Sequence, residues 1–151
     1  MGSLSLSESY IQKINSYIDK DPFSQTARPN IDEVSFSKIS QDIILRLPCK
    51  GRLLDIGANN GLIDIALAPF YDHILAVEPA TEMYDVLKRN VVDIPNIKTE
   101  MATGAAFKTK KLFDELLMYA VTVYLDEQDL TDTIRNLILC LKDKSFVLIG
   151  E

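Results

Sequence analysis

The sequence of 151 residues has no tryptophan, only one histidine and only two cysteines. With His73 as its single imidazole, the chain is a poor candidate for a histidine-based metal site, and we expect no bound metal. Cys49 and Cys140 are too few and too far apart in sequence for a disulfide framework. Two reduced thiols are typical of a cytoplasmic protein, which is the location that we expect.

The chain also lacks long runs of one residue type. No apolar run approaches the roughly 18 to 20 residues of a membrane-spanning helix. No basic region followed by an apolar block marks a secretory signal at the N-terminus. With 16 Lys or Arg against 22 Asp or Glu, the formal net charge is −6 and no basic run stands out. Neutralisation of phosphates drives non-specific nucleic-acid binding, so we expect neither a nucleic acid nor a membrane as partner.

What the chain does contain is ordinary globular composition, with 47% apolar and 25% charged residues. This length and composition predict one domain over residues 1–151. Apolar residues recur at helical spacing over 7–18 and again over 36–47, which predicts two amphipathic helices. Two prolines and polar residues predict a loop over 20–34, where Arg28 could close over a ligand or be simply solvated. Residues 1–50 thus form N-terminal helices with a loop, and 51–151 form the core.

Short apolar runs alternate with helical segments after residue 51. The runs predict strands over 52–56, 73–77, 97–101, 115–119 and 145–149, with helices over 61–68, 81–90 and 127–141. Asp126 is a suitable N-cap for the last helix, and a turn is expected over 143–145. Nearly continuous apolar strands separated by helices indicate an α/β fold with a doubly wound, mainly parallel sheet.

The segment from Leu53 to Gly61 carries the chemistry. It is a predicted strand that runs into a glycine turn and opens a helix, the usual ligand cradle of such sheets. The turn contains only two glycines, Gly57 and Gly61, and Asp55 stands just before it. Because a carboxylate repels a pyrophosphate and attracts a positive charge, the turn suits a ligand with an ammonium group. Glu78 ends the next strand 17 residues beyond Gly61, where a carboxylate can accept hydrogen bonds from both ribose hydroxyls. A nucleoside with a cationic tail describes S-adenosylmethionine.

From Gly51 to Ile149 the sequence resembles the class I S-adenosylmethionine-dependent methyltransferases, which have a Rossmann-like fold. The resemblance rests on residues 54–61, 77–79 and 112–117 and on the closing helix and strand. It implies that the turn from Asp55 to Gly61 holds the methionine amino and carboxyl groups and that Glu78 binds the ribose. Further cofactor-binding residues implied by it are Gly57, Ala58 and Asn59 in the turn, Pro79, Ala80, Met83, Met101 and Ala102 around the adenine, and Tyr119 and Ala120 near the reacting methyl.

The sequence departs from the family pattern in several places, among them Asn59 where the family often has glycine and Asp143-Lys144-Ser145 where it has a Pro-Gly-Gly turn. No acidic residue stands after the third strand to bind the adenine amine; Met101 or Ala102 aligns there instead. Strands six and seven of the family are missing after residue 149. We therefore expect a truncated core whose sheet edge is covered by a missing C-terminal segment or by another subunit.

The leading functional hypothesis is a methyltransferase that acts on a small-molecule acceptor. No catalytic base is evident; Tyr124 or a carboxylate could serve, and Tyr119 or Tyr124 could line the acceptor site or be ordinary half-buried aromatics. The alternative is a non-catalytic or truncated module that binds the cofactor or a protein partner. A nicotinamide-dependent dehydrogenase is disfavoured, because the third glycine of its fingerprint is absent.

Overall fold

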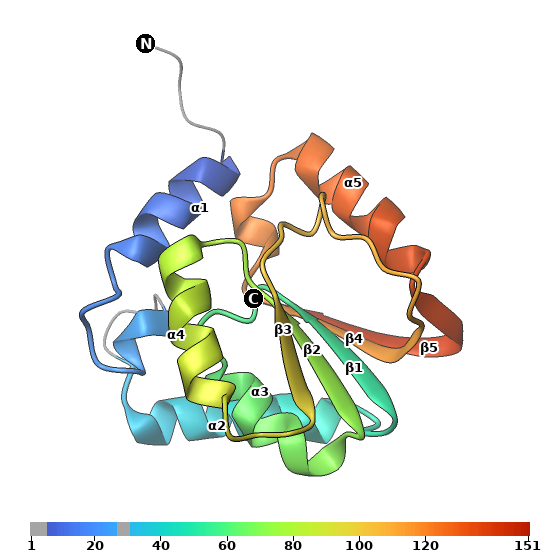
Figure 1. The fold of residues 1–151 in the computed structure, drawn as a ribbon, viewed down its shortest axis with the longest axis horizontal. Coiled ribbons are helices and arrows are strands. Elements are labelled where there is room, and N and C mark those ends of the chain that lie inside the picture. Colours follow the sequence, from blue (N-terminus) through green and yellow to red (C-terminus); the bar gives the residue numbers. More distant parts are fainter. Residues whose placement is uncertain (1–5, 27–30) are drawn as a thin grey trace.

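The computed structural model describes residues 6–26 and 31–151, so Arg28 lies outside the described residues. Short 3-10 helices accompany the main elements. In chain order the elements are α1 (Leu6–Asn15), η1 (Ser24–Thr26), α2 (Glu33–Arg46), β1 (Arg52–Ile56), α3 (Leu62–Leu67), η2 (Ala68–Phe70), β2 (His73–Val77), α4 (Thr81–Val91), β3 (Ile97–Glu100), β4 (Phe113–Tyr119), η3 (Thr122–Tyr124), α5 (Glu127–Ile138) and β5 (Leu141–Gly150) (Figure 1).

The five strands form one sheet in the order β3-β2-β1-β4-β5, and every neighbouring pair is parallel. The prediction of a doubly wound α/β fold is therefore confirmed. The chain leaves β1 toward α3 and leaves β4 toward α5, on opposite faces of the sheet (Figure 1). A crevice for ligands opens at such a switch point, outside the carboxyl ends of the strands.

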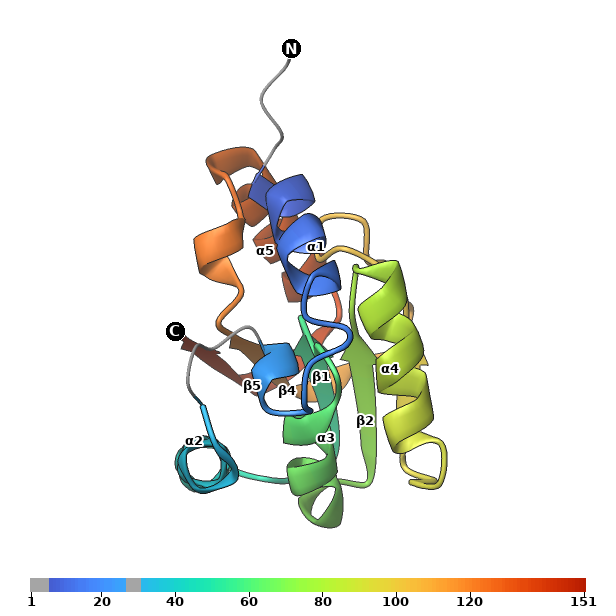
Figure 2. The same ribbon diagram turned by 90° about the vertical axis from the view of Figure 1, so that its left-hand side faces the viewer.

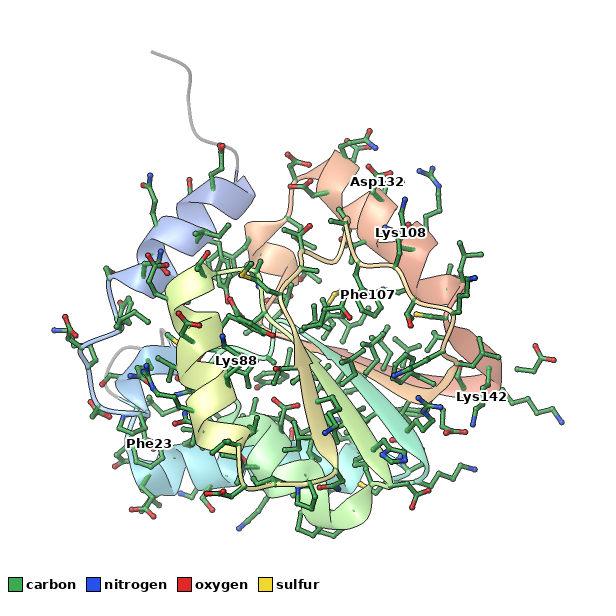
Figure 3. All side chains as sticks on the ribbon, viewed as in Figure 1. Phe23, Lys88, Phe107, Lys108, Asp132 and Lys142 are labelled. Atoms are coloured by element: carbon green, nitrogen blue, oxygen red, sulfur yellow. The ribbon has the colours of Figure 1, made fainter. Side chains whose placement is uncertain are left out.

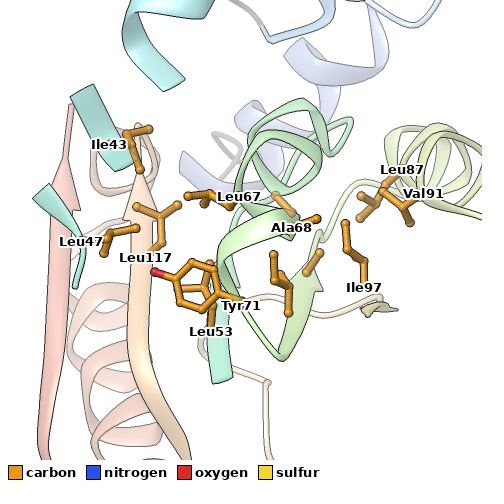
Figure 4. Packing of buried hydrophobic residues seen from close by; sticks show 13 residues of the cluster. Ile43, Leu47, Leu53, Leu67, Ala68, Tyr71, Leu87, Val91, Ile97 and Leu117 are labelled. Atoms are coloured by element: carbon orange, nitrogen blue, oxygen red, sulfur yellow. The ribbon is translucent and has the colours of Figure 1, made fainter. Parts of the chain in front are cut away.

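Both faces of the sheet are covered, which explains why its strands are apolar almost throughout. One face packs against α2, α3 and α4 in a cluster that includes Ile43, Leu67 and Leu87 (Figure 4). The other face packs against α5 and the loop over 101–112. From that loop Phe107 points into the core, whereas Lys108 points outward (Figure 3).

The N-terminal helix α1 lies over the carboxyl ends of the strands, close to both α4 and the segment before α5 (Figure 2). Ile14 of α1 is only 1% exposed and packs with Met83 and Val86 of α4. Burial of one such side chain stabilises the fold by about 1.5–3 kcal/mol. Helix α1 thus covers the predicted ligand crevice.

A buried carboxylate fixes the opposite, amino end of β1. Glu115 on β4 accepts hydrogen bonds from the backbone N–H of Cys49 and Lys50 at 3.3 and 3.1 Å and from the Tyr71 hydroxyl. Because Glu115 is fully buried, these donors replace its hydration. The loop that leads into β1 is thereby tied to the neighbouring strand.

The last two elements differ from the expected bounds. Helix α5 begins after its predicted N-cap, Asp126, but ends at Ile138, and β5 begins at Leu141 rather than Ser145. The turn expected over 143–145 was wrong: these residues belong to an irregular stretch of β5 in which Lys144 has φ 62°. Two bonds to β4 hold this early start, Phe113 N–H to the Cys140 carbonyl and Lys142 to Asp114.

Strand β5 forms an edge of the five-stranded sheet in the described residues. Its side chains include three large apolar ones with substantial exposure, Phe146, Val147 and Ile149. No helix in the described part of the chain has the length and apolar character needed to cross a membrane.

Candidate functional site

The turn between β1 and α3 adopts left-handed backbone conformations at three positions. Gly57, Asn59 and Gly61 have φ values of 83°, 53° and 81°. Asparagine is one of the few residues with a side chain that tolerates this region. A Cβ on Gly61 would lie 2.6 Å from Leu87 of α4, and one on Gly57 would collide with Val121. The two glycines therefore permit both the turn and its close packing.

The turn is bonded to the end of β2. The Val77 carbonyl accepts hydrogen bonds from Gly57 N–H at 2.8 Å and Ala58 N–H at 2.9 Å. The residue that directly follows β2, Glu78, is fully buried. Its Oε2 accepts from Asn59 N–H at 2.8 Å and its Oε1 from Ala80 N–H at 2.9 Å. Burial raises the pKa of Glu78 to about 7, and the two N–H bonds oppose that rise.

Glu78 also meets the N-terminal helix. The Tyr10 hydroxyl donates to Glu78 Oε2 at a long 3.4 Å. Burial and the nearby Glu78 charge raise the pKa of Tyr10, so its phenol stays protonated. A carboxylate offers about four lone-pair positions, and two backbone N–H groups occupy two of them. The remaining acceptor capacity of Glu78 faces the side where α1 closes.

Two further carboxyl groups are buried behind the turn. Asp55, the penultimate residue of β1, is 3% exposed, and Asp64 of α3 is fully buried. Neither Asp64 oxygen receives an N–H or hydroxyl hydrogen bond from the described residues. Burial raises the pKa of Asp55 to about 7, and burial together with the Asp55 charge raises the pKa of Asp64. At neutral pH the pair holds a proton between its two carboxyl groups.

Two adjoining cavities open at this edge of the sheet. The first has a volume of about 60 Å³, and the second about 80 Å³. Pro79, Ala102, Gly104 and Leu125 help to line the first; Asn59, Phe36, Tyr119 and Ala120 help to line the second. Gly57, Tyr10 and Tyr124 line both.

Tyr10 and Tyr124 close these cavities from above. Their ring centroids are 4.6 Å apart, and Lys13 Nζ donates to the Tyr124 hydroxyl at 3.1 Å. The contact joins α1 to η3, which follows β4. Sequence reasoning missed Tyr10, because nothing in the spacing of α1 indicates which of its aromatic residues faces a glutamate 68 positions away.

The structure brings most of the predicted cofactor residues to this edge, at different depths. Asp55, Gly57, Ala58, Asn59, Gly61, Glu78, Pro79, Ala102, Tyr119 and Ala120 lie in or beside the turn and the two cavities. Ala80 contributes its N–H to Glu78 and is itself buried. Met83 is buried against α1, and Met101 is 52% exposed; neither lines either of these two cavities.

His73 lies at the amino end of β2, away from this edge, where the sequence placed it. In the part of the chain that the structure describes, no three His, Cys, Asp or Glu side chains are arranged to hold a metal ion.

Neither a family model nor a curated protein matches the sequence. Solved structures do match the fold. Phosphoethanolamine N-methyltransferase 1 of Haemonchus contortus, in complex with phosphoethanolamine and S-adenosylhomocysteine, superposes with a TM-score of 0.81 at 17% identity over 91% of this chain. An S-adenosylmethionine-dependent methyltransferase of Leishmania major gives 0.75 at 21% identity over 97%. The glycopeptide N-methyltransferase MtfA, complexed with S-adenosylmethionine, gives 0.66 at 16% identity over 75%.

The chain therefore has the Rossmann-like fold of the class I S-adenosylmethionine-dependent methyltransferases. It spans 30%, 64% and 48% of the three neighbouring chains, respectively.

Proposed function

We propose that this protein binds S-adenosylmethionine at the carboxyl ends of β1, β2 and β4 and transfers its methyl group to a small-molecule acceptor. The observation that carries the proposal is the position of Glu78. Its carboxylate lies beside the glycine turn and is oriented by two backbone N–H groups. Its sequence neighbour Pro79 lines the first cavity, and its bonded partner Asn59 lines the second. Methyltransferases with this fold, in complex with the same cofactor or its demethylated product, support the choice of ligand.

The residues present fit that cofactor. Glu78 can accept hydrogen bonds from two ribose hydroxyls once its long hydrogen bond from Tyr10 is broken. The buried Asp55 and Asp64 supply negative charge beneath the turn for an ammonium group. The first cavity is almost wholly apolar, with Pro79 and Ala102 as walls, and suits the adenine ring. The second, between Asn59 and Tyr119, suits the methionine end.

The cofactor, when bound, supplies a methyl group on a sulfonium that is displaced in line by the acceptor. The protein's part is to align the acceptor and to exclude water. Helix α1 and Tyr124 cover the second cavity and carry out that exclusion. Aromatic faces also stabilise a positive charge by cation–π attraction, so the Tyr10, Tyr119 and Tyr124 side chains favour a cationic or amine acceptor.

Calorimetry on the intact protein tests the binding step. The wild type should bind S-adenosylmethionine and S-adenosylhomocysteine at one site. In Glu78→Gln the affinity should fall by about 10- to 150-fold, because a buried hydrogen bond to a charged group contributes about 1.5–3 kcal/mol. Glu82→Gln, an exposed change in the first turn of α4, is the matched control and should bind normally. A folded wild type that binds neither compound would refute the proposal.

Turnover is tested separately with labelled cofactor and a set of small amines, alcohols and thiols. Transfer of label that depends on Tyr124 supports an enzyme. Tight binding with no transfer to any acceptor favours the alternative, a non-catalytic cofactor-binding module. That alternative is motivated by the shorter span of this chain relative to its structural neighbours.

A further inference from the structure

A second concave site lies at the opposite, amino end of the sheet. It is a groove of about 270 Å³ across the first residues of β1, β2 and β3, well separated from the cavities beside Glu78. Its volume approaches the roughly 300 Å³ at which small-molecule pockets begin. Arg52, His73, Leu75, Lys98, Lys111 and Phe113 line it.

The parallel register places the ionisable side chains on one face. Arg52 pairs with His73, and Leu75 two residues further along β2 pairs with Lys98. Paired residues of neighbouring strands share a face, as do residues two apart in a strand. Arg52, His73 and Lys98 therefore project from the same face of the sheet, the one covered by α5. The loop over 101–112, which crosses this side of the sheet (Figure 1), adds Lys111 to the groove.

No carboxylate neutralises this group. Among the described residues, none of these four side chains takes part in an ion pair. The nearest acid along the neighbouring strand, Asp114, accepts from the Arg52 backbone N–H at 2.8 Å and binds Lys142 Nζ. The other nearby acid, Asp72, precedes His73 on the exposed surface. In a chain of net charge −6, a groove whose ionisable lining residues are all basic is not explained by composition.

Arg52 supplies the observation that points to a ligand. Its Nε–H is buried and has no acceptor among the described residues, although a buried unsatisfied donor costs about 1–3 kcal/mol. The guanidinium carbon lies 5.5 Å from the centre of the Phe113 ring, a cation–π contact that holds the planar group in one orientation. A planar guanidinium held in one orientation presents its terminal N–H groups to an oxyanion and can bind it through two parallel hydrogen bonds.

We propose that this groove binds the phosphoryl group of a small phosphorylated molecule. Arg52 donates hydrogen bonds to two phosphoryl oxygens. Lys98 and Lys111 neutralise the charge from the sides, and Leu75 and Phe113 contact the organic part. The groove is too small for a nucleic-acid helix or a folded partner. This site does not depend on the proposed methyltransferase activity, because it shares no residue with the Glu78 edge.

Titrations followed by amide chemical shifts test the site, with inorganic phosphate and phenyl phosphate as probes in the intact chain. Shifts confined to residues of the groove, with phenyl phosphate bound more tightly than phosphate, support a phosphate ester as the ligand. Equal affinities for the two probes would place the recognition in the anion alone and remove the apolar contacts from the proposal.

Variants separate the groove from general surface charge. Arg52→Gln should weaken phenyl phosphate binding by about tenfold or more, since a hydrogen bond to a charged group is lost. The pair Lys98→Gln and Lys111→Gln alters only exposed residues and should also weaken binding, which covers the case that Arg52→Gln fails to fold. Lys108→Gln, an exposed lysine of the same loop outside the groove, should leave the affinity unchanged. Shifts spread over all lysines, or binding of an acidic peptide but not of phenyl phosphate, would overturn the proposal.

Discussion

At their carboxyl ends β1 and β2 carry Asp55 and Glu78, whereas at their amino ends the same two strands carry Arg52 and His73. The acidic edge is buried, roofed by α1 and bonded to the glycine turn. The basic edge is an open groove covered only in part by the loop over 101–112. The five-residue strand β1 thus carries a basic side chain, Arg52, near one end and a carboxyl group, Asp55, near the other.

The difference shows how burial controls whether an ionisable group is charged near neutral pH. The pKa values of Asp55 and Glu78 both rise to about 7 because burial disfavours the ionised forms. At that edge charge and protonation are coupled near neutral pH. The basic side chains of the groove are mostly exposed. The acidic edge therefore suits a cationic ligand whose binding depends on pH, and the basic edge suits an anion whose binding depends on salt.

The largest effect should come from the core that both edges share. Leu54 lies between Arg52 and Asp55 on β1 and is fully buried. Leu54→Ala should lower the free energy of unfolding by about 2–5 kcal/mol, the cost of a lost side chain plus a cavity. Urea denaturation measures it, with Leu45→Ala, which is 85% exposed, as control. A loss below that of the control would show that the strand is not packed as described.

Stability should also respond to pH through the acidic edge. Below pH 4 the buried carboxyls are protonated in both states. As pH rises toward 7, the unfolded chain ionises while folded Asp55 and Glu78 retain protons, so the free energy of unfolding of the ligand-free protein falls. Asp64→Asn removes one buried acid and should restore about 1–3 kcal/mol at pH 7.5. Asp93→Asn, an exposed change, should restore nothing. An unchanged slope in Asp64→Asn contradicts this account.

Cofactor affinity should change with pH in the opposite sense. Ribose hydroxyls and an ammonium group bind to ionised carboxylates, so affinity for S-adenosylmethionine should rise from pH 6 to pH 8. For each proton that binding releases, the affinity should rise about tenfold with each pH unit. Calorimetry in two buffers of different ionisation enthalpy counts those protons. Both should be non-phosphate buffers, so that the basic groove stays unoccupied. Affinity that is flat over this range would mean that the site is already ionised.

The smallest effect should be that of salt, and it should distinguish the two edges. The screening length falls from about 10 Å at 0.1 M ionic strength to about 3 Å at 1 M. Phenyl phosphate binding at the exposed cations should therefore weaken several-fold, while S-adenosylmethionine binding at the buried carboxyls should change little. Parallel titrations at both salt concentrations measure the contrast. Equal salt dependence would remove the distinction between a buried and an open edge.

The acidic edge could be predicted from sequence largely because its signals are local. Gly57, Asn59 and Gly61 indicate their backbone conformations by residue type, and Glu78 follows an apolar strand at a readable distance. Asp64 has one local signal, its position as an acid inside the apolar helix Leu62–Leu67. Its role depends on packing against Asp55 across the helix–sheet interface, which no spacing rule gives.

The remaining features depend on contacts between distant segments. The basic groove requires the register that pairs Arg52 with His73 and Leu75 with Lys98. The early start of β5 depends on Lys142 reaching Asp114, whereas the local residues Asp143, Lys144 and Ser145 indicate a turn. Parallel register and edge pairing are set by tertiary packing, and a local pattern does not contain them.

The tilted ring pair of Tyr10 and Tyr124 has a practical consequence for spectroscopy. The chain has no tryptophan, so its ultraviolet emission comes from six tyrosines alone. These two rings lie 4.6 Å apart on the wall of both cavities. A ligand that enters there and separates the rings alters a signal that no indole obscures. Tyrosine fluorescence therefore reports directly on whether a ligand occupies the acidic edge.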